Sequence, residues 1–228
     1  MIPEAVPPLR GQAARWAGQR ERRRAEFVDA ALGVIAEQGP AVSVEDIAAR
    51  VGVARTRLYR HFTDRADLER AISERVARLV MAELEPLWRP QGSARQMIAG
   101  AIGSYVRWIG ANRNLHLYLH AHARPTDDAT DAETDAVSGV RRAVAEHLSG
   151  LFGGYLGLLG LDPSIATDLA HAVVGMVESV ADRWAAVGGS EPDAVIERLG
   201  LWTWAMLADT LAGAGVTLDP DLPLPPLG

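Results

Sequence analysis

The 228-residue chain lacks cysteine and lysine and has no long apolar run. Without cysteine it can form no disulfide, no thiolate metal site and no cysteine nucleophile. The first residues, MIPEAVPPLRGQAARW, contain no apolar stretch of the kind that a signal peptide needs. The weakly charged stretch 148–161 is too short and too rich in glycine to span a bilayer. We therefore expect a cytoplasmic protein with no membrane partner.

All 23 cationic residues are arginine, and they are distributed unevenly. Between Arg10 and Arg65 there are 11 arginines and seven acidic residues, a net charge of +4. From Val76 onward there are 10 arginines and 18 acidic residues, a net charge of −8. A basic segment on an otherwise acidic chain is typical of a protein that meets a polyanion at one end only. The overall charge of −6 therefore does not exclude a nucleic-acid binder.

Apolar residues recur with helical spacing through most of the chain, and no segment alternates with period two. The pattern predicts an all-α fold of about nine helices. Residues 1–19 contain three prolines and no periodicity, so we expect a flexible arm there. The expected helices run from Arg20 to the Gly39-Pro40 pair, from Ser43 to the turn at Gly52, over 55–62, and from Asp64 toward Pro86, and then near 93–110, 113–123, 135–158, 163–187 and 192–213.

The most informative stretch is SVEDIAARVGVARTRLYRHFTDRADL, residues 43–68. Ser43 is a predicted N-cap, and Asp46 three residues later makes an acidic variant of the capping box. Gly52 predicts a tight turn between this short helix and the next one at 55–62. A capped short helix, a glycine turn and a second short helix are the parts of a helix-turn-helix motif.

The second short helix has few inward residues and a strongly basic outer side. Leu58 and Phe62 lie four apart and point one way, toward a core. The opposite side carries a row of polar and charged side chains, which would be poorly placed in a core. They would be well placed in the major groove of DNA, because arginine pairs bidentately with guanine. This outward row consists of Thr56, Arg57 and Arg60, with Tyr59 at its edge.

This stretch closely resembles the N-terminal domain of the TetR/AcrR family of regulators. The match runs from about Arg20 to Leu68 and includes the glycine turn followed by Leu58-Tyr59-x-His61-Phe62. The resemblance implies a three-helix DNA-binding domain at 20–75 and a helical ligand-binding and dimerisation domain at 76–228. It further implies a homodimeric repressor that binds an inverted-repeat operator and is released by a small hydrophobic or aromatic effector.

The resemblance also implies roles for single residues. Tyr59 and His61 contact phosphates, the exposed residues of 55–60 approach bases, and Arg65 meets the DNA backbone near a helix N-terminus. At least one of the arginines before the first apolar face, Arg20, Arg22, Arg23 and Arg24, is expected to contact phosphates or the minor groove. The predicted DNA-binding residues are Arg20, Arg22, Arg23, Ser43, Arg55, Thr56, Arg57, Tyr59, Arg60, His61 and Arg65.

Two positions depart from the family pattern. Ala54 stands where the family usually has a capping serine or threonine, a loss of about 1 kcal/mol that predicts a less ordered second helix without DNA. Arg57 stands where a small residue is usual. It either reads an additional base or lies along the phosphate backbone, and we favour the base contact.

The last two long helices have the character of a dimer interface. The segment 199–211, LGLWTWAMLADTL, is apolar nearly all round, and such a helix needs cover on every side. A partner subunit supplies that cover in a homodimer. A monomer with a central last helix is the alternative. The predicted dimer contacts are Val173, Val177, Val180, Trp184, Trp202 and Met206.

Aromatic and polar residues of the middle helices are candidates for lining an effector pocket. His116 and His120 lie four apart, a spacing that fits zinc. No carboxylate or cysteine lies near them in the sequence, so we predict no metal and no cofactor. The predicted ligand-binding residues are Trp88, Tyr105, Trp108, His116, Tyr118, His120 and Met176.

Competing functions explain less of the chain. We find no nucleophile elbow, metal signature or phosphate-binding loop, so we do not expect an enzyme. A helical small-molecule-binding protein without a DNA role would leave the exposed arginines of 55–60 unexplained.

Overall fold

The computed structural model describes residues 10–84, 87, 91–122, 136–188, 191–225 and 227. These ranges contain nine α-helices, one 3-10 helix and a single isolated bridge between Ser93 and Pro223. The predicted all-α fold is confirmed. The chain divides into two compact units, Met1–Ile72 and Ser73–Gly228. That division falls three residues before the boundary that we expected after residue 75.

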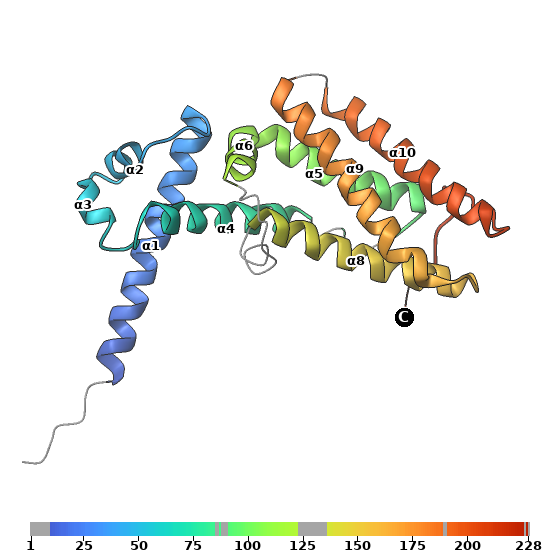
Figure 1. Ribbon diagram of the computed structural model, residues 1–228, viewed down its shortest axis with the longest axis horizontal. Helices are drawn as coiled ribbons and strands as arrows, with labels where there is room; N and C mark the ends of the chain where they lie inside the picture. Colours follow the sequence, from blue (N-terminus) through green and yellow to red (C-terminus); the bar gives the residue numbers. More distant parts are fainter. Residues whose placement is uncertain are drawn as a thin grey trace, which may run out of the picture. The chain divides into compact units, whose positions relative to one another are not determined.

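The first unit contains α1 (Arg10–Gln38), α2 (Val44–Arg50), α3 (Arg55–Leu58) and the start of α4 (Arg65–Glu83) (Figure 1). α1 ends at Gly39, whose φ of 99° suits glycine and which precedes Pro40. Large apolar side chains from each helix, spaced three or four apart, form the buried core of this unit. They include Phe27, Ile35, Ile47, Leu58, Phe62, Leu68 and Ile72.

The expected flexible arm at 1–19 is wrong for its second half, because α1 begins at Arg10. Residues 10–19, RGQAARWAGQ, contain no proline and consist largely of alanine, arginine and glutamine. These are strong helix formers, so the helix extends beyond its apolar face without needing tertiary contacts. The absence of apolar periodicity shows that the segment has no apolar face to bury. It does not show that the backbone is not helical.

α3 is shorter than the expected helix at 55–62. After Leu58 the chain continues in turns, with hydrogen bonds from Arg60 N to Arg57 O (3.3 Å) and from His61 N to Leu58 O (2.9 Å). Ala54 has extended backbone angles (φ −72°, ψ 146°) and makes no side-chain capping bond, as its sequence predicted. A helix of one turn without a cap has little to stabilise its i to i+4 hydrogen bonds, so the chain changes to the i to i+3 bonds of a 3-10 turn.

The second unit is a helical bundle made of α5 (Ala94–Ala111), α6 (Arg113–Ala121), α8 (Ala136–Leu158), α9 (Ala166–Val187) and α10 (Pro192–Gly213). α8 packs along α9, and α5 packs along α10 (Figure 1). A 3-10 helix, Pro163–Ile165, leads into α9, and Pro192 occupies the first turn of α10. The expected bounds of these helices agree with the structure to within a few residues.

Beyond α10 the chain turns back across the start of α5. We call residues 216–225 the C-terminal strap. Arg95 N donates to Pro220 O (3.0 Å), Leu224 N donates to Gly92 O (3.0 Å), and Arg95 Nε pairs with Asp221 Oδ1 (2.7 Å). These bonds fix the strap as part of the bundle wall. No described helix combines the length and apolar character that a membrane crossing requires.

Candidate functional site

α2 is fixed by the capping box that the sequence predicted. Asp46 N donates to Ser43 Oγ (3.1 Å), and Ser43 N donates to Asp46 Oδ2 (3.0 Å). The Ser43 hydroxyl and then the Ser43 N–H donate to the Asp46 carboxylate and hold its pKa below its usual value. Gly52 follows with a φ of 70°, and Val53 N donates to Ala48 O (3.0 Å). The turn between α2 and α3 is therefore built as a helix-turn-helix motif requires.

α3 has one buried side and one exposed side, as its sequence predicted. Leu58 and Phe62 are fully buried, whereas Thr56, Arg57 and Arg60 are exposed. Arg57 and Arg60 have no acidic partner within the described ranges, so their guanidinium groups face solvent without an ion pair.

Arg55 is held in place by its neighbours. Its Nη1 lies 2.5 Å from Glu45 Oε1, and its guanidinium lies 5.4 Å from the centre of the half-buried Tyr59 ring. α2 and α3 are therefore linked by an ion pair between their side chains. DNA would have to compete with Glu45 for Arg55, but not for Arg57 or Arg60.

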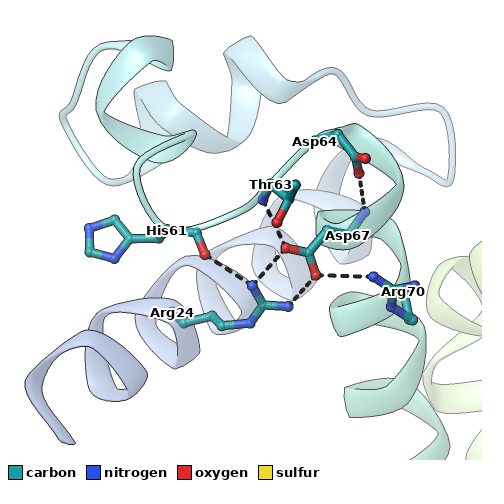
Figure 2. Close-up of polar contacts among 6 residues, drawn as sticks. All are labelled: Arg24, His61, Thr63, Asp64, Asp67 and Arg70. Atoms are coloured by element: carbon teal, nitrogen blue, oxygen red, sulfur yellow. Dashed lines mark hydrogen bonds and ion pairs between the residues drawn. The ribbon is translucent and has the colours of Figure 1, made fainter. Parts of the chain in front are cut away.

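Arg24 joins α1 to the start of α4 within the first unit (Figure 2). Its Nη2 lies 2.6 Å from Asp67 Oδ1, and its Nη1 donates to Asp67 Oδ2 and to His61 O, each at 3.0 Å. The guanidinium also covers the Phe62 ring at 4.4 Å. We call this the Arg24–Asp67 clamp. The Arg24 guanidinium is therefore engaged within the first unit, and its contact with DNA stays a prediction.

The carboxylate of the clamp is heavily hydrogen-bonded (Figure 2). Besides Arg24, Asp67 accepts from Thr63 N (2.9 Å) and from Arg70 Nη2 (3.3 Å). The Arg24 guanidinium is the main reason why the pKa of Asp67 lies far below its usual range. Asp67 N donates in turn to Asp64 Oδ1 (2.7 Å), so Asp64 caps α4. The clamp joins residues 43 positions apart, a pairing that no local motif indicates.

His61 is partly enclosed by apolar surface. Its ring lies 5.4 Å from the Phe27 ring and points away from the Arg24–Asp67 clamp (Figure 2). Its Nδ1 is buried and has no hydrogen-bond partner among the described residues. Burial, with Arg20, Arg23 and Arg57 nearby, lowers the pKa of His61, so the ring is neutral at pH 7. A neutral imidazole still has one N–H to offer a phosphate.

The other arginines of the predicted DNA-binding set are exposed. Arg20, Arg22 and Arg23 lie on α1, where Arg23 pairs with Glu26 at 2.7 Å and Arg22 donates to Gly18 O. Arg65, the first residue of α4, pairs with Glu69 at 2.6 Å. Surface pairs of this kind contribute little stability, so phosphates can displace them.

The second unit contains a cavity of about 590 Å³. Its walls come from α5, α8, α9 and α10, and Leu218, Leu224 and Pro225 of the C-terminal strap complete them. The lining is mainly apolar. The side chains include Ile102, Val144, Phe152, Val173, Val177 and Leu207.

A small polar group interrupts the apolar lining. Arg141 Nε of α8 lies 2.5 Å from Glu178 Oε2 of α9, and both residues line the cavity. Burial raises the pKa of Glu178 even though Arg141 opposes the shift. Tyr105 of α5 also lines the cavity, and burial raises the pKa of its hydroxyl. A ligand with one hydrogen-bonding group could be oriented here.

Tyr105 is the one predicted ligand-binding residue in the described ranges that lines the cavity. Trp88 lies outside those ranges. The remaining predicted residues lie elsewhere in the second unit, because sequence spacing shows which residues share a helix face but not which neighbour that face meets. The residues that do not line the cavity are Trp108, His116, Tyr118, His120 and Met176.

The two histidines instead form a polar cluster between α6 and α9. His116 Nε2 lies 3.0 Å and His120 Nε2 lies 3.4 Å from the same oxygen of Asp182, Oδ1. The two imidazole ring centres are 4.4 Å apart, and His116 is fully buried. The expectation that no carboxylate lies near this pair is wrong. Asp182 follows His116 by 66 residues, and only the packing of α6 against α9 brings them together.

The predicted dimer contacts divide into two groups. Val173 and Val177 are buried within the bundle and line its cavity, so these two are not free surface, whereas Met206 is half-buried against the same core. Val180 and Trp184 are half-buried. Trp202 is 46% exposed, and its neighbour Leu201 is 54% exposed. The α10 pattern was apolar all round because one side faces the core and the other presents large apolar side chains to solvent.

An all-α chain with a helix-turn-helix motif and an arginine-bearing α3 belongs to the class of helix-turn-helix transcriptional regulators. Residues 27–72 match the family model described as bacterial regulatory proteins, tetR family. Residues 27–72 therefore form a DNA-binding domain of the TetR family of bacterial regulatory proteins.

The chain is also similar to three individual proteins. It is 25% identical over 218 residues, 94% of this chain and 89% of the relative, to an uncharacterized HTH-type transcriptional regulator of Mycobacterium tuberculosis. It is 41% identical over 68 residues, 30% of this chain and 35% of the relative, to the HTH-type transcriptional repressor LfrR of Mycolicibacterium smegmatis. The fold is similar to that of a tetR-family transcriptional regulator from Streptomyces coelicolor, with a TM-score of 0.67, 20% identity, and coverage of 85% and 83% of the two chains.

Proposed function

We propose that this regulator is a cytoplasmic homodimeric repressor, which binds an inverted-repeat operator and is released from it by an apolar effector. The observation that carries the proposal is the outward side of α3 and of the turn after it, where Thr56, Arg57 and Arg60 are exposed while Leu58 is buried. Arginines in that position suit guanine edges in the major groove. LfrR, a named repressor, is similar to the chain over 68 residues.

The homodimer rests on the exposed apolar residues of α10. Leu201 and Trp202 are large, adjacent and about half exposed, and a second copy would bury them. A closed two-fold dimer presents two copies of α3 related by the same axis, so its operator is an inverted repeat.

The effector site is the cavity of the second unit. Its volume of about 590 Å³ lies within the range of small-molecule sites. An apolar body would contact the lining, and one polar group would meet Tyr105 or the Arg141–Glu178 pair. The chain acts in this scheme by binding and not by catalysis. Release of DNA requires that the effector bind more tightly to a conformation in which the two α3 helices do not fit the operator. A tenfold loss of operator affinity needs a difference of about 1.4 kcal/mol between the effector's binding free energies for the two conformations.

Selection of DNA fragments from a random pool by the purified protein tests the DNA role and reads the half-site. Arg60→Ala should change the preferred base at one position per half-site and weaken operator binding by about 1–3 kcal/mol. Tyr59→Phe should weaken binding to all sequences alike, because a phosphate contact carries no sequence information. Arg142→Ala, an exposed arginine of α8, is the matched control and should bind as the wild type does. Selection of no sequence, or an unchanged base preference in Arg60→Ala, would contradict the assignment.

The effector role needs a separate experiment. Apolar compounds that raise the thermal unfolding temperature should also lower operator affinity. Val173→Phe, which adds volume at the cavity wall, should reduce the response to such compounds while operator binding without them stays near wild type. A full response in Val173→Phe would show that the compounds bind elsewhere.

A further inference from the structure

We propose that His116, His120 and Asp182 form a binding site for a first-row divalent transition-metal ion. The ligand atoms would be Nε2 of each histidine and a carboxylate oxygen of Asp182. These three donor atoms lie within 4.8 Å of one another. The inference is independent of the DNA and effector roles.

The distances between the donors suit a small metal ion. Ligand atoms held about 2.0–2.1 Å from Zn²⁺ in a tetrahedron are about 3.3 Å apart. The two histidine nitrogens lie 3.0 and 3.4 Å from Asp182 Oδ1. Two of the three separations are therefore already close to those of an occupied site, and small side-chain rotations can adjust the third.

The helices hold the donors in position. His116 and His120 are one turn apart on α6, so both face the same way, and Asp182 projects from α9, which packs on α6. The exposed fractions of the side chains are 2% for His116, 26% for His120 and 36% for Asp182. One side of the cluster is thus closed by protein and the other is open to water. Such a site offers three protein ligands and leaves a position for water.

The donor set favours one group of metals. Two imidazoles and one carboxylate suit Zn²⁺, Ni²⁺, Cu²⁺ or Fe²⁺, whereas Mg²⁺ and Ca²⁺ prefer oxygen ligands alone. We commit to a transition metal, with Zn²⁺ and Co²⁺ as probes, because Co²⁺ occupies zinc-type sites and gives visible absorption bands.

The cluster lies next to the cavity wall. The Tyr105 ring, which lines the cavity, meets the His116 ring edge-on with centres 6.3 Å apart. Glu178, one turn before Asp182 on α9, also lines the cavity. A bound ion would therefore fix α6 to α9 directly behind the polar part of the cavity.

Titration of tag-free, chelator-treated full-length protein tests the site. Co²⁺ should produce visible absorption at one ion per chain, Zn²⁺ should displace it, and Mg²⁺ at the same concentration should not. His120→Ala and Asp182→Asn should each weaken Zn²⁺ binding at least tenfold. His171→Ala removes an exposed histidine from the same helix as Asp182 and should leave the affinity unchanged. Circular dichroism in chelator checks that each variant is folded.

The proposal is overturned if wild-type protein binds Zn²⁺ no more tightly than His120→Ala does, or if His171→Ala weakens binding as much. X-ray absorption spectroscopy of the zinc-loaded wild type provides a test that needs no variant. It should show two imidazole ligands with nitrogen and oxygen donors at about 2.0–2.1 Å. A zinc shell without imidazole would also overturn the assignment.

Discussion

Thr203→Val should stabilise the protein, although it removes a polar group from a helix of the bundle. Thr203 lies on α10, is 3% exposed and lines the cavity. Its Oγ1 is buried and finds no hydrogen-bond partner in the part of the chain that the structure describes. A buried hydroxyl without a partner costs about 1–3 kcal/mol, and valine replaces it with a methyl group that gains from burial.

We therefore expect the free energy of unfolding to rise by about 1–3 kcal/mol in Thr203→Val. For a chain of this length, each kcal/mol corresponds to about 2–4 °C in the midpoint of thermal unfolding. Both quantities can be measured by urea and thermal unfolding, followed by tryptophan fluorescence. The protein concentration must be the same for all variants, because the proposed dimerisation would also shift the apparent stability.

Thr210 on the same helix is the matched control. It also lines the cavity, but its Oγ1 donates to Met206 O at 2.9 Å. Thr210→Val removes this bond and should be neutral or lower the free energy of unfolding by up to about 1.5 kcal/mol. The reasoning is refuted if Thr203→Val is less stable than the wild type, or if both variants change stability in the same direction by the same amount.

Three further substitutions test other parts of the structure. Ala54→Ser should supply the missing cap of α3 and raise the free energy of unfolding by about 0.5–1 kcal/mol in urea denaturation; a decrease would show that residue 54 cannot cap. Asp67→Asn should lower that free energy by roughly 1.5–3 kcal/mol at pH 7. Because folding lowers the pKa of Asp67, its contribution is present above about pH 4 and is lost as the pH falls further, so the difference from wild type should shrink in acid; a constant difference would contradict the clamp. Trp202→Glu should yield monomers by light scattering at micromolar concentration, whereas Arg142→Glu should remain dimeric; a dimeric Trp202→Glu would exclude this part of α10 from the interface.

Much of the fold follows from local pattern and could be predicted from the sequence. The Ser43 capping box, the glycine turn and the buried residues Leu58 and Phe62 are contained within 20 residues, and each was found as expected. The missing cap at Ala54 was also visible in the sequence. The sequence did not show that the helix would then end after one turn. That outcome depends on a small difference in free energy between i to i+4 and i to i+3 hydrogen bonds.

The sites were harder to predict because distant segments build them. Arg24 and Asp67 are 43 residues apart, and His116 and Asp182 are 66 residues apart. Each pair depends on which helices pack together. The same limit affected Val173 and Val177, whose apolar side faces the cavity of their own bundle. A helical wheel shows that such a side must be covered, but not whether the cover is a partner subunit or the same chain.

The second half of α8 contains four glycines, at positions 150, 153, 154 and 157. In a helix each costs about 0.8–1.0 kcal/mol relative to alanine, so this segment depends on tertiary packing for its structure. It also carries six residues of the cavity wall, Leu148, Leu151, Phe152, Tyr155, Leu156 and Leu158.

Local opening of the bundle should therefore begin at this end of α8, and its amide hydrogens should exchange with deuterium before those of α9. A molecule in the cavity would contact the same segment and slow that exchange. Access to the cavity would then be set by the frequency of this opening and not by the width of a fixed entrance.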